Sequence, residues 1–294
     1  MSCEFIDFAR AHGVEVDPTK LVPRDRIQRC GTKLHPRSTN GAYHWDGARG
    51  WAFAWDGDAC VHWWNDPHAR PWTEAEKAAW RAKRDAERQS RETSHRRAAV
   101  RAAEMLRTAV PCPHDYLFRK GLPDAQGLVL PDGALMVPMR KLDSNELVGA
   151  QMIRWLPDRM RWEKKMLLGM RAKGAVLRLG PRTAAETIFC EGFATGLSIE
   201  LAVRQMRLSM AVLVCFSDAN MVHVAGLLKS GRRYVFADND KSGAGERAAK
   251  AMGLPYVMSP VEGEDANDFH VRAGLMAVCG LLQSVRKAAA GEPV

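Results

Sequence analysis

Short apolar runs organise the C-terminal part of the chain. Residues 187–190 and 234–237 are rich in β-branched and aromatic side chains, and residues 211–216 form a third such run between them. Runs of this length, bounded by turn residues, predict buried strands, and the helix-length segments between them predict crossover helices. The pattern therefore predicts an open, mainly parallel α/β sheet, which binds its ligand at the carboxyl ends of its strands.

Upstream, the pattern of polar and apolar positions changes several times. Residues 4–12 have helical spacing, whereas residues 27–65 alternate aromatic and small residues around the turn signals Trp45-Asp46-Gly47 and Trp55-Asp56-Gly57. This alternation predicts a small antiparallel β-meander. Residues 73–108 contain neither Gly nor Pro and carry many charges. They predict one long solvated helix, or two, that begins with Thr73 as its cap.

The remaining elements complete an α/β chain with α+β character overall. Apolar residues 135–140 and 147–154 flank a turn and predict a hairpin, and residues 197–206, 246–252 and 269–290 predict helices. We expect four parts. They are a β-rich module (1–70), a helical connector (71–110), a basic subdomain (111–182) and an α/β domain (183–294).

Composition limits the class of protein. The 294 residues carry a formal net charge of +9, which is typical of either an ordinary basic protein or one that binds a polyanion. Seven scattered cysteines without a CxxC pair predict a reduced, cytoplasmic protein. The chain shows no signal peptide and no run of 18 apolar residues, so we expect no membrane segment.

Acidic residues follow two of the predicted strands. Glu191 ends the run 187–190, and Asp238 and Asp240 end the run 234–237. If these carboxylates converge, they form an oxygen-only site that suits Mg²⁺ or Mn²⁺. The alternative interpretation is that they are solvated loop residues or helix caps.

The order of these motifs resembles the Toprim domain of bacterial-type primases, topoisomerases and some nucleases. The matching residues are Ile188-Phe189-Cys190-Glu191-Gly192 and Val235-Phe236-Ala237-Asp238-Asn239-Asp240. A later acidic cluster adds Asp265 and Asp268, where many Toprim primases carry another acidic motif. The resemblance implies that Glu191, Asp238 and Asp240 are catalytic metal ligands, with Asp265 and Asp268 as outer candidates. Glu191 could instead act as the base for a 3′-hydroxyl.

A second resemblance lies before this domain. Tyr116-Leu117-Phe118-Arg119-Lys120-Gly121 is similar to an element that opens the catalytic core of phage- and plasmid-type primases. It implies a DNA primase of the phage or mobile-element type, which joins ribonucleoside triphosphates on a single-stranded DNA template in the bacterial host cytoplasm. A separate helicase would be its partner. The implied nucleotide and DNA contacts are Arg119, Lys120, Arg154, Lys164, Lys165, Lys173, Asn220 and Lys241.

The N-terminal module resembles a primase zinc ribbon. Its candidate ligands are Cys30, His35, Cys60 and His62, but their spacing lacks the paired CxxC or CxxH pattern of a zinc site. We therefore expect a degenerate ribbon without zinc. Its aromatic residues either form the core of the small sheet or stack on unpaired bases, and both uses can coexist.

Two other functions remain open. A Toprim nuclease would use the same metal ion to activate water, and a non-catalytic replication accessory protein would keep the fold only to bind DNA. A cluster of carboxylates argues against the accessory protein, because like charges without a cation disfavour ionisation. A topoisomerase needs a much larger chain and is set aside.

Overall fold

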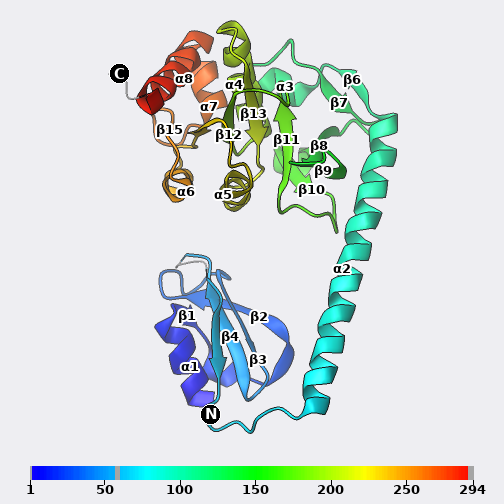
Figure 1. The fold of residues 1–294 in the computed structure, drawn as a ribbon, viewed down its shortest axis with the longest axis vertical. Helices are drawn as coiled ribbons and strands as arrows, with labels where there is room; N and C mark the ends of the chain where they lie inside the picture. Colours follow the sequence, from blue (N-terminus) through cyan, green and yellow to red (C-terminus); the bar gives the residue numbers. More distant parts are fainter. Residues whose placement is uncertain (1, 57–59, 291–294) are drawn as a thin grey trace. The chain divides into compact units, whose positions relative to one another are not determined.

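A computed structural model of the chain describes residues 2–56 and 60–290, except for the side chains of residues 2 and 3 (Figure 1). The chain forms two compact units, Met1–Lys83 and Arg84–Val294. Helix α2 (Glu74–Thr108) contributes residues to both. Each unit has a hydrophobic core of its own.

The N-terminal unit is a five-stranded antiparallel sheet covered on one face by α1 (Ser2–Ala11). A short 3₁₀ turn, Pro18–Lys20, precedes the second strand. The strands follow sequence order and are β1 (Val14–Glu15), β2 (Arg24–Thr32), β3 (Gly41–Trp45), β4 (Arg49–Ala54) and β5 (His62–Asn65).

Alternation along these strands decides which aromatic rings are buried. Tyr43, Trp45 and Trp64 pack around Phe5 of the helix, with ring centroids 5.5 to 6.1 Å apart. Trp63 points to the opposite side of the sheet and is 72% exposed. The aromatic residues thus supply the core of this unit and leave some rings in solvent, as the alternation predicted.

The two predicted turns have different outcomes. The turn after Trp45 is confirmed, because the Asp46 carboxylate accepts hydrogen bonds from the backbone N–H groups of Ala48 and Arg49. The second turn includes Gly57, which lies outside the described residues.

Residues 74–108 form one helix rather than two. It starts with reciprocal hydrogen bonds, in which Thr73 Oγ1 accepts from the Glu76 N–H and Glu76 Oε2 accepts from the Thr73 N–H. Of its described side chains, only Ala98 and Ala102 are buried. Ala102 belongs to a cluster with Met136 and Met152, which anchors the last turns of α2 to the sheet of the C-terminal unit.

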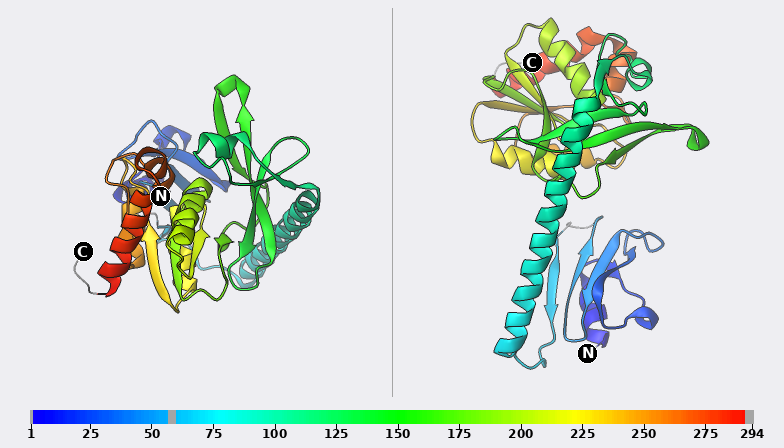
Figure 2. Two further views of the ribbon diagram at one scale, coloured as in Figure 1. Left: turned by 90° about the horizontal axis from the view of Figure 1, so that it is seen from above. Right: turned by 90° about the vertical axis from the view of Figure 1, so that its right-hand side faces the viewer.

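The C-terminal unit is built on a ten-stranded mixed sheet with the order β10-β9-β8-β11-β13-β12-β14-β15. In addition, β7 pairs with β8, and β6 pairs with β7. The antiparallel part contains β6 (Val110–Cys112), β7 (Gly127–Val129), β8 (Leu135–Lys141), β9 (Leu147–Leu156), β10 (Arg161–Met166) and β11 (Ala175–Leu179). The parallel part contains β12 (Glu186–Cys190), β13 (Met210–Val214), β14 (Arg232–Phe236) and β15 (Tyr256–Val257). The predicted hairpin at residues 135–154 is therefore present. A second hairpin, β9–β10, projects from the unit (Figure 2) and packs against Tyr116 and Arg119 of α3.

Helices cover both faces of the parallel part (Figure 1). The two faces alternate along each strand, so that Ile188 faces α4, α7 and α8, whereas Phe189 faces α5 and α6. The helices of this unit, apart from α2 and the 3₁₀ turn Pro157–Arg159, are α3 (Asp115–Arg119), α4 (Phe193–Gln205), α5 (Asp218–Leu227), α6 (Ala244–Met252), α7 (Ala266–Ala273) and α8 (Leu275–Ala290).

Two predicted helix boundaries were wrong. The helix expected at 197–206 begins at Phe193, directly after Gly192, because its small residues pack tightly against the sheet. The helix expected at 269–290 is two helices, separated at Gly274, whose φ of +85° stops the first helix. None of the helices in the described residues has the length and apolar character needed to cross a membrane.

Candidate functional site

Three neighbouring parallel strands each deliver an acid at the same edge of the sheet. Glu191 follows β12, Asp218 follows the end of β13, and Asp238 follows the end of β14. The strands are in register, with Cys190 opposite Val214 and Phe189 opposite Val235, so their carboxyl ends lie side by side. Sequence analysis missed Asp218, although its place just after the apolar run 211–216 was the available signal.

The backbone beyond β13 places Asp218 beside Glu191. The Cys215 N–H donates to the Cys190 carbonyl at 2.9 Å, and the Phe216 N–H donates to the Glu191 carbonyl at 2.9 Å. Phe216 has a φ of +66°, which is uncommon for a bulky residue. The chain therefore pairs for two residues past the strand and then turns sharply into α5, with Asp218 at its first position.

Glu191 and Asp218 form a carboxyl pair. Burial, and then the charge and hydrogen bond of Asp218, raise the pKa of Glu191 to about 7. Burial also raises the pKa of Asp218, and the charge of Asp240 adds to this effect. The hydrogen bond favours the protonated form of Glu191 and the ionised form of Asp218, so Glu191 donates and Asp218 accepts.

Asp238 is the most buried of these carboxylates. Burial, and then the charges of Asp265, Glu191, Asp218 and Asp240, raise the pKa of Asp238 to about 8. Its Oδ1 atom is inaccessible to solvent and accepts no hydrogen bond from the described residues. A buried carboxylate oxygen without a partner is costly unless a cation or a proton meets it.

Gly245 allows α6 to approach Asp238. A Cβ atom on Gly245 would lie 2.3 Å from the Asp238 carbonyl oxygen, so no larger residue fits without moving the backbone. The first turn of α6 is thereby held against the strand end, and its N–H groups face Asp240.

Asp240 is held by its own loop. Its Oδ1 accepts hydrogen bonds from the Ser242 N–H at 2.8 Å, from the Ser242 hydroxyl and from the Ala244 N–H at 3.3 Å, and its Oδ2 accepts one from the Gly245 N–H at 3.0 Å. Burial acts to raise the pKa of Asp240, but these hydrogen bonds outweigh it and lower the pKa to about 2. Asp240 is therefore ionised at neutral pH, and its Oδ2 retains a lone pair for another ligand.

These residues fit a hard divalent cation. All the candidate ligand atoms are carboxylate oxygens. Burial, and then the charges of neighbouring acids, raise the pKa values of all three acids at the strand ends, Glu191, Asp218 and Asp238. In residues 2–56 and 60–290, no three His, Cys, Asp or Glu side chains already enclose one point as a complete metal cluster. Glu191, Asp238 and Asp240 are the residues that would hold such a cation, and it would neutralise their negative charge.

The two outer acidic candidates have structural partners. Asp265 Oδ1 accepts from the backbone N–H groups of Asn267 and Asp268 at 2.7 and 2.8 Å and so caps α7. Asp268 forms an ion pair with Lys120 at 3.1 Å. Lys120 and Asp268, which sequence analysis placed among phosphate contacts and metal ligands respectively, thus contact each other.

Three of the basic candidates, Arg154, Lys164 and Lys165, lie on the hairpin β9–β10. On β10, Trp162, Lys164 and Met166 share one face and Arg161, Glu163 and Lys165 the other. The charge of Lys164 lowers the pKa of Glu191, so this face of β10 lies near the acidic site. Lys165 pairs with Glu163 at 2.9 Å, and Arg154 pairs with Asp132 at 2.8 Å. The Arg119 guanidinium lies 4.9 Å from the Trp155 ring centre.

Asn220 and Lys173 line one pocket of about 540 Å³ next to Asp218, together with Ser217 and His223. Asn220 also has a structural task, because its side chain donates to the carbonyls of Ala175 and Cys215 at 2.8 Å and accepts from the Gly174 N–H at 2.7 Å. Lys241 is exposed on the loop between β14 and α6.

The four zinc candidates are not gathered into a metal cluster in the described part of the chain. His35 Nδ1 is instead paired with Asp56 at 2.6 Å, and the His62 ring stacks on the His12 ring with centroids 3.8 Å apart. Burial raises the pKa of the Cys30 thiol to about 11, which disfavours the thiolate that zinc requires. Cys60 lies on the exposed segment before β5.

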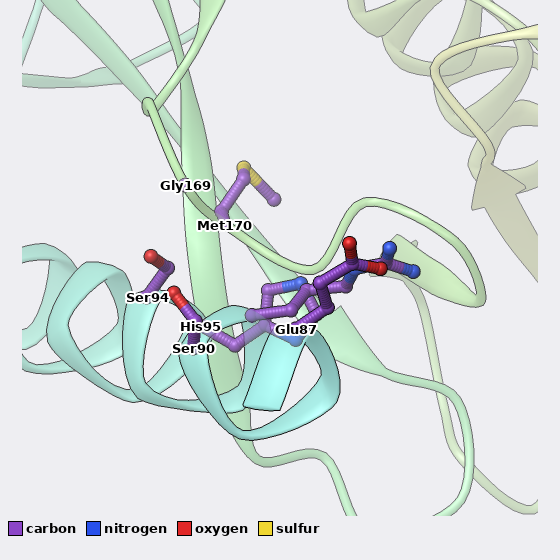
Figure 3. A pocket seen from close by; sticks show the side chains of 7 residues that line it. Glu87, Ser90, Ser94, His95, Gly169 and Met170 are labelled. Carbon is purple, nitrogen blue, oxygen red and sulfur yellow. The ribbon is translucent and has the colours of Figure 1, made fainter. Parts of the chain in front are cut away.

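A further hollow, of about 370 Å³, lies between α2 and the loop after β10. Figure 3 shows Ser90, Ser94 and His95 of the helix near Gly169 and Met170 of the loop. The acids of the strand ends do not reach this hollow, so we do not assign it to the site.

Comparisons with known proteins agree with the geometry of the parallel part. Residues 186–275 match the Toprim domain family, and this segment contains β12 to β15 together with all the acids of the site. The chain is thus a mixed α/β protein that contains a Toprim domain, preceded by an antiparallel β-module and a long helix, as the sequence predicted.

Among solved structures, the chain is similar to the RNA polymerase domain of the Mycobacterium tuberculosis primase DnaG. The identity is 15%, the TM-score is 0.38, and the match covers 69% of this chain and 86% of that one. A comparison with curated protein sequences finds no match.

Proposed function

We propose that the chain is a primase that joins ribonucleoside triphosphates on single-stranded DNA in a reaction that depends on a divalent metal ion. The observation that carries this proposal is the buried, unpaired Oδ1 of Asp238 among carboxylates at the carboxyl edge of a Toprim sheet. Lys164 of β10 adds one positive charge that acts on Glu191 at this edge, and a polyanionic substrate would need such a charge.

Each acid then has a distinct part in the reaction. Asp238 and Asp240 would hold Mg²⁺ or Mn²⁺, with Glu191 beside them, and such an ion neutralises charge that develops on the attacked phosphate. Glu191 has a raised pKa of about 7, so its ionised form is suited to accept the proton of the primer 3′-hydroxyl. Lys164 lowers the pKa of Glu191 and limits this rise.

The incoming nucleotide would bind beside these acids. The pocket of about 540 Å³ that contains Lys173 and Asn220 opens next to Ser217 and Asp218. Lys173 there would meet a phosphate, and the apolar wall formed by Met166, Cys215 and Val222 would contact the base or ribose. Lys120, Lys165 and Lys241 remain predicted contacts of the nucleic acid backbone, and a separate helicase partner remains a prediction.

The test is primer synthesis on single-stranded DNA with labelled ribonucleotides and Mg²⁺ or Mn²⁺. We expect the wild type to synthesise primers. Asp238→Asn and Asp240→Asn should each reduce primer synthesis to background. Asp143→Asn is the matched control, because Asp143 lies in the exposed turn between β8 and β9. Primer synthesis that persists in both site variants refutes the mechanism. Metal-dependent nicking without nucleotides, in place of synthesis, identifies a nuclease instead.

A further inference from the structure

A pocket of about 470 Å³ lies near the turn of the hairpin β9–β10, separate from the pocket that contains Lys173 and Asn220. Two tryptophans and a histidine give it aromatic walls, and charged side chains stand at its edge. The residues that matter are His114, Asp115, Asp132, Arg154, Trp155 and Trp162.

The aromatic walls are fixed before any ligand arrives. Trp155 and Trp162 are directly opposite each other in the β9–β10 register, and their ring centroids are 5.3 Å apart at an angle of 61°. Trp162 also packs against His114 and Tyr116, each with centroids 5.4 Å away. His114 accepts the Tyr116 N–H at Nδ1 and donates from Nε2 to the Gly133 carbonyl, both at 3.1 Å, so its ring cannot turn freely.

The charges around the pocket favour a neutral ring over an anion. Asp115 and Asp132 both line it, and their carboxylates would repel a triphosphate. A nucleobase is uncharged and can stack its π-face on the rings. Its N–H groups can donate hydrogen bonds to a carboxylate. Arg154 pairs with Asp132 in the lining of the pocket, and the Arg119 guanidinium lies over the Trp155 ring. Both can meet the phosphates that flank such a base.

Lys164 links this pocket to the acidic site. Lys164 lies two residues after Trp162 on the same side of β10, and its Nζ is 5.6 Å from the centre of the Tyr116 ring. The charge of Lys164 also acts on Glu191. A single DNA strand with one base in the pocket could therefore run past Lys164 toward the acids.

We propose that this pocket holds one unpaired base of the single-stranded DNA template, stacked on Trp155. The inference rests on the proposed function for its substrate, and it adds a site that fixes the register of the template relative to the acids. The same pocket chemistry would suit the base of a free nucleotide, so the experiment separates the two sources.

The experiment measures binding of full-length protein to a fluorescein-labelled single-stranded DNA in EDTA, without nucleotides. Each base of the DNA is replaced in turn by an abasic residue. We expect one position at which loss of the base weakens binding at least about five-fold, since a stacked base contributes about that much to affinity. In Trp155→Ala this penalty at that one position should vanish, whereas Trp155→Phe should retain it. Trp63→Ala removes an exposed indole of β5 and should also retain it.

The proposal is overturned if no position shows a penalty, or if Trp155→Ala weakens binding equally at all positions. A 5-iodouracil placed at the sensitive position should crosslink to Trp155 or His114, and crosslinks elsewhere would contradict the assignment. If 5-iodo-UTP crosslinks to Trp155 while the DNA shows no sensitive position, the pocket holds a free nucleotide instead. Because the assay needs no catalysis, a position-specific penalty without primer synthesis would leave this site standing and refute only the proposed reaction.

Discussion

Asp238→Asn should stabilise the metal-free protein while it removes activity. Asp238 is an ionisable side chain that burial and four neighbouring acids force toward its protonated form. Asparagine has nearly the same shape and carries no charge, so the substitution removes the repulsion and leaves the packing intact. Asp238 would then serve metal binding and lower the stability of the metal-free protein.

The size of the effect follows from the pKa. A carboxyl with a raised folded pKa binds its proton more tightly when folded, so its ionisation lowers stability as the pH rises from the unfolded value toward the folded one. For Asp238 that window runs from 3.8 to about 8. At about 1.4 kcal/mol per pH unit, the cost reaches roughly 4 kcal/mol at pH 7. We therefore expect Asp238→Asn to be about 2–4 kcal/mol more stable than wild type at pH 7, because neighbouring acids share the relief.

Urea unfolding in EDTA between pH 4 and pH 8.5 measures this difference. The gap between variant and wild type should widen with pH and nearly close at pH 4, and Asp143→Asn in the exposed turn should show no such gap. Millimolar Mg²⁺ should stabilise the wild type and leave Asp238→Asn unchanged. A variant that is less stable than wild type at pH 8, or a gap that does not depend on pH, would refute the reasoning.

Three further predictions concern the same unit. Gly245→Ala should reduce primer synthesis and Mg²⁺ binding at least ten-fold, since its Cβ would lie 2.3 Å from the Asp238 carbonyl oxygen, and calorimetric titration with Mg²⁺ checks this. Arg286→Ala should lower the unfolding free energy by about 2–3 kcal/mol in urea denaturation, because it removes the two hydrogen bonds that the Arg286 guanidinium donates to the buried Glu186 carboxylate. Mg²⁺ binding should release protons and strengthen as pH rises from 6 to 8, since Asp238 and Glu191 have pKa values of about 8 and 7, and titration in buffers of different ionisation enthalpy counts those protons.

Strand assignment was the reliable part of the sequence analysis. The apolar runs that end at Glu191 and Asp238 became β12 and β14, because continuous β-branched and aromatic runs are stable only when buried on both faces. Helix ends were less certain. Helix α4 starts at Phe193 because it packs closely on the sheet, where a Cβ on Gly196 would lie 2.4 Å from Val214. The local sequence pattern does not indicate that contact.

The acids show the same division. Spacing along the chain made Glu191, Asp238 and Asp240 candidates. It did not single out Asp218, because the pairing of Asp218 with Glu191 requires two strands to be neighbours in the sheet. The sequence motif also included Asp240. Its hydrogen bonds to the first turn of α6 and its low pKa, however, depend on how the loop folds. Lys120 and Asp268 are 148 residues apart and pair only after folding.

The sequence by itself determined which segments are strands and which acids follow them, because hydrophobic period and strand-end residue type are local properties of the chain. Only the tertiary structure decided which of those acids is protonated, which is held by a loop and which has an unpaired oxygen. It also brought Trp155, Trp162 and His114 into one pocket. These outcomes depend on burial and on distances between segments remote in sequence, and the energy of a charge or a ring depends on both.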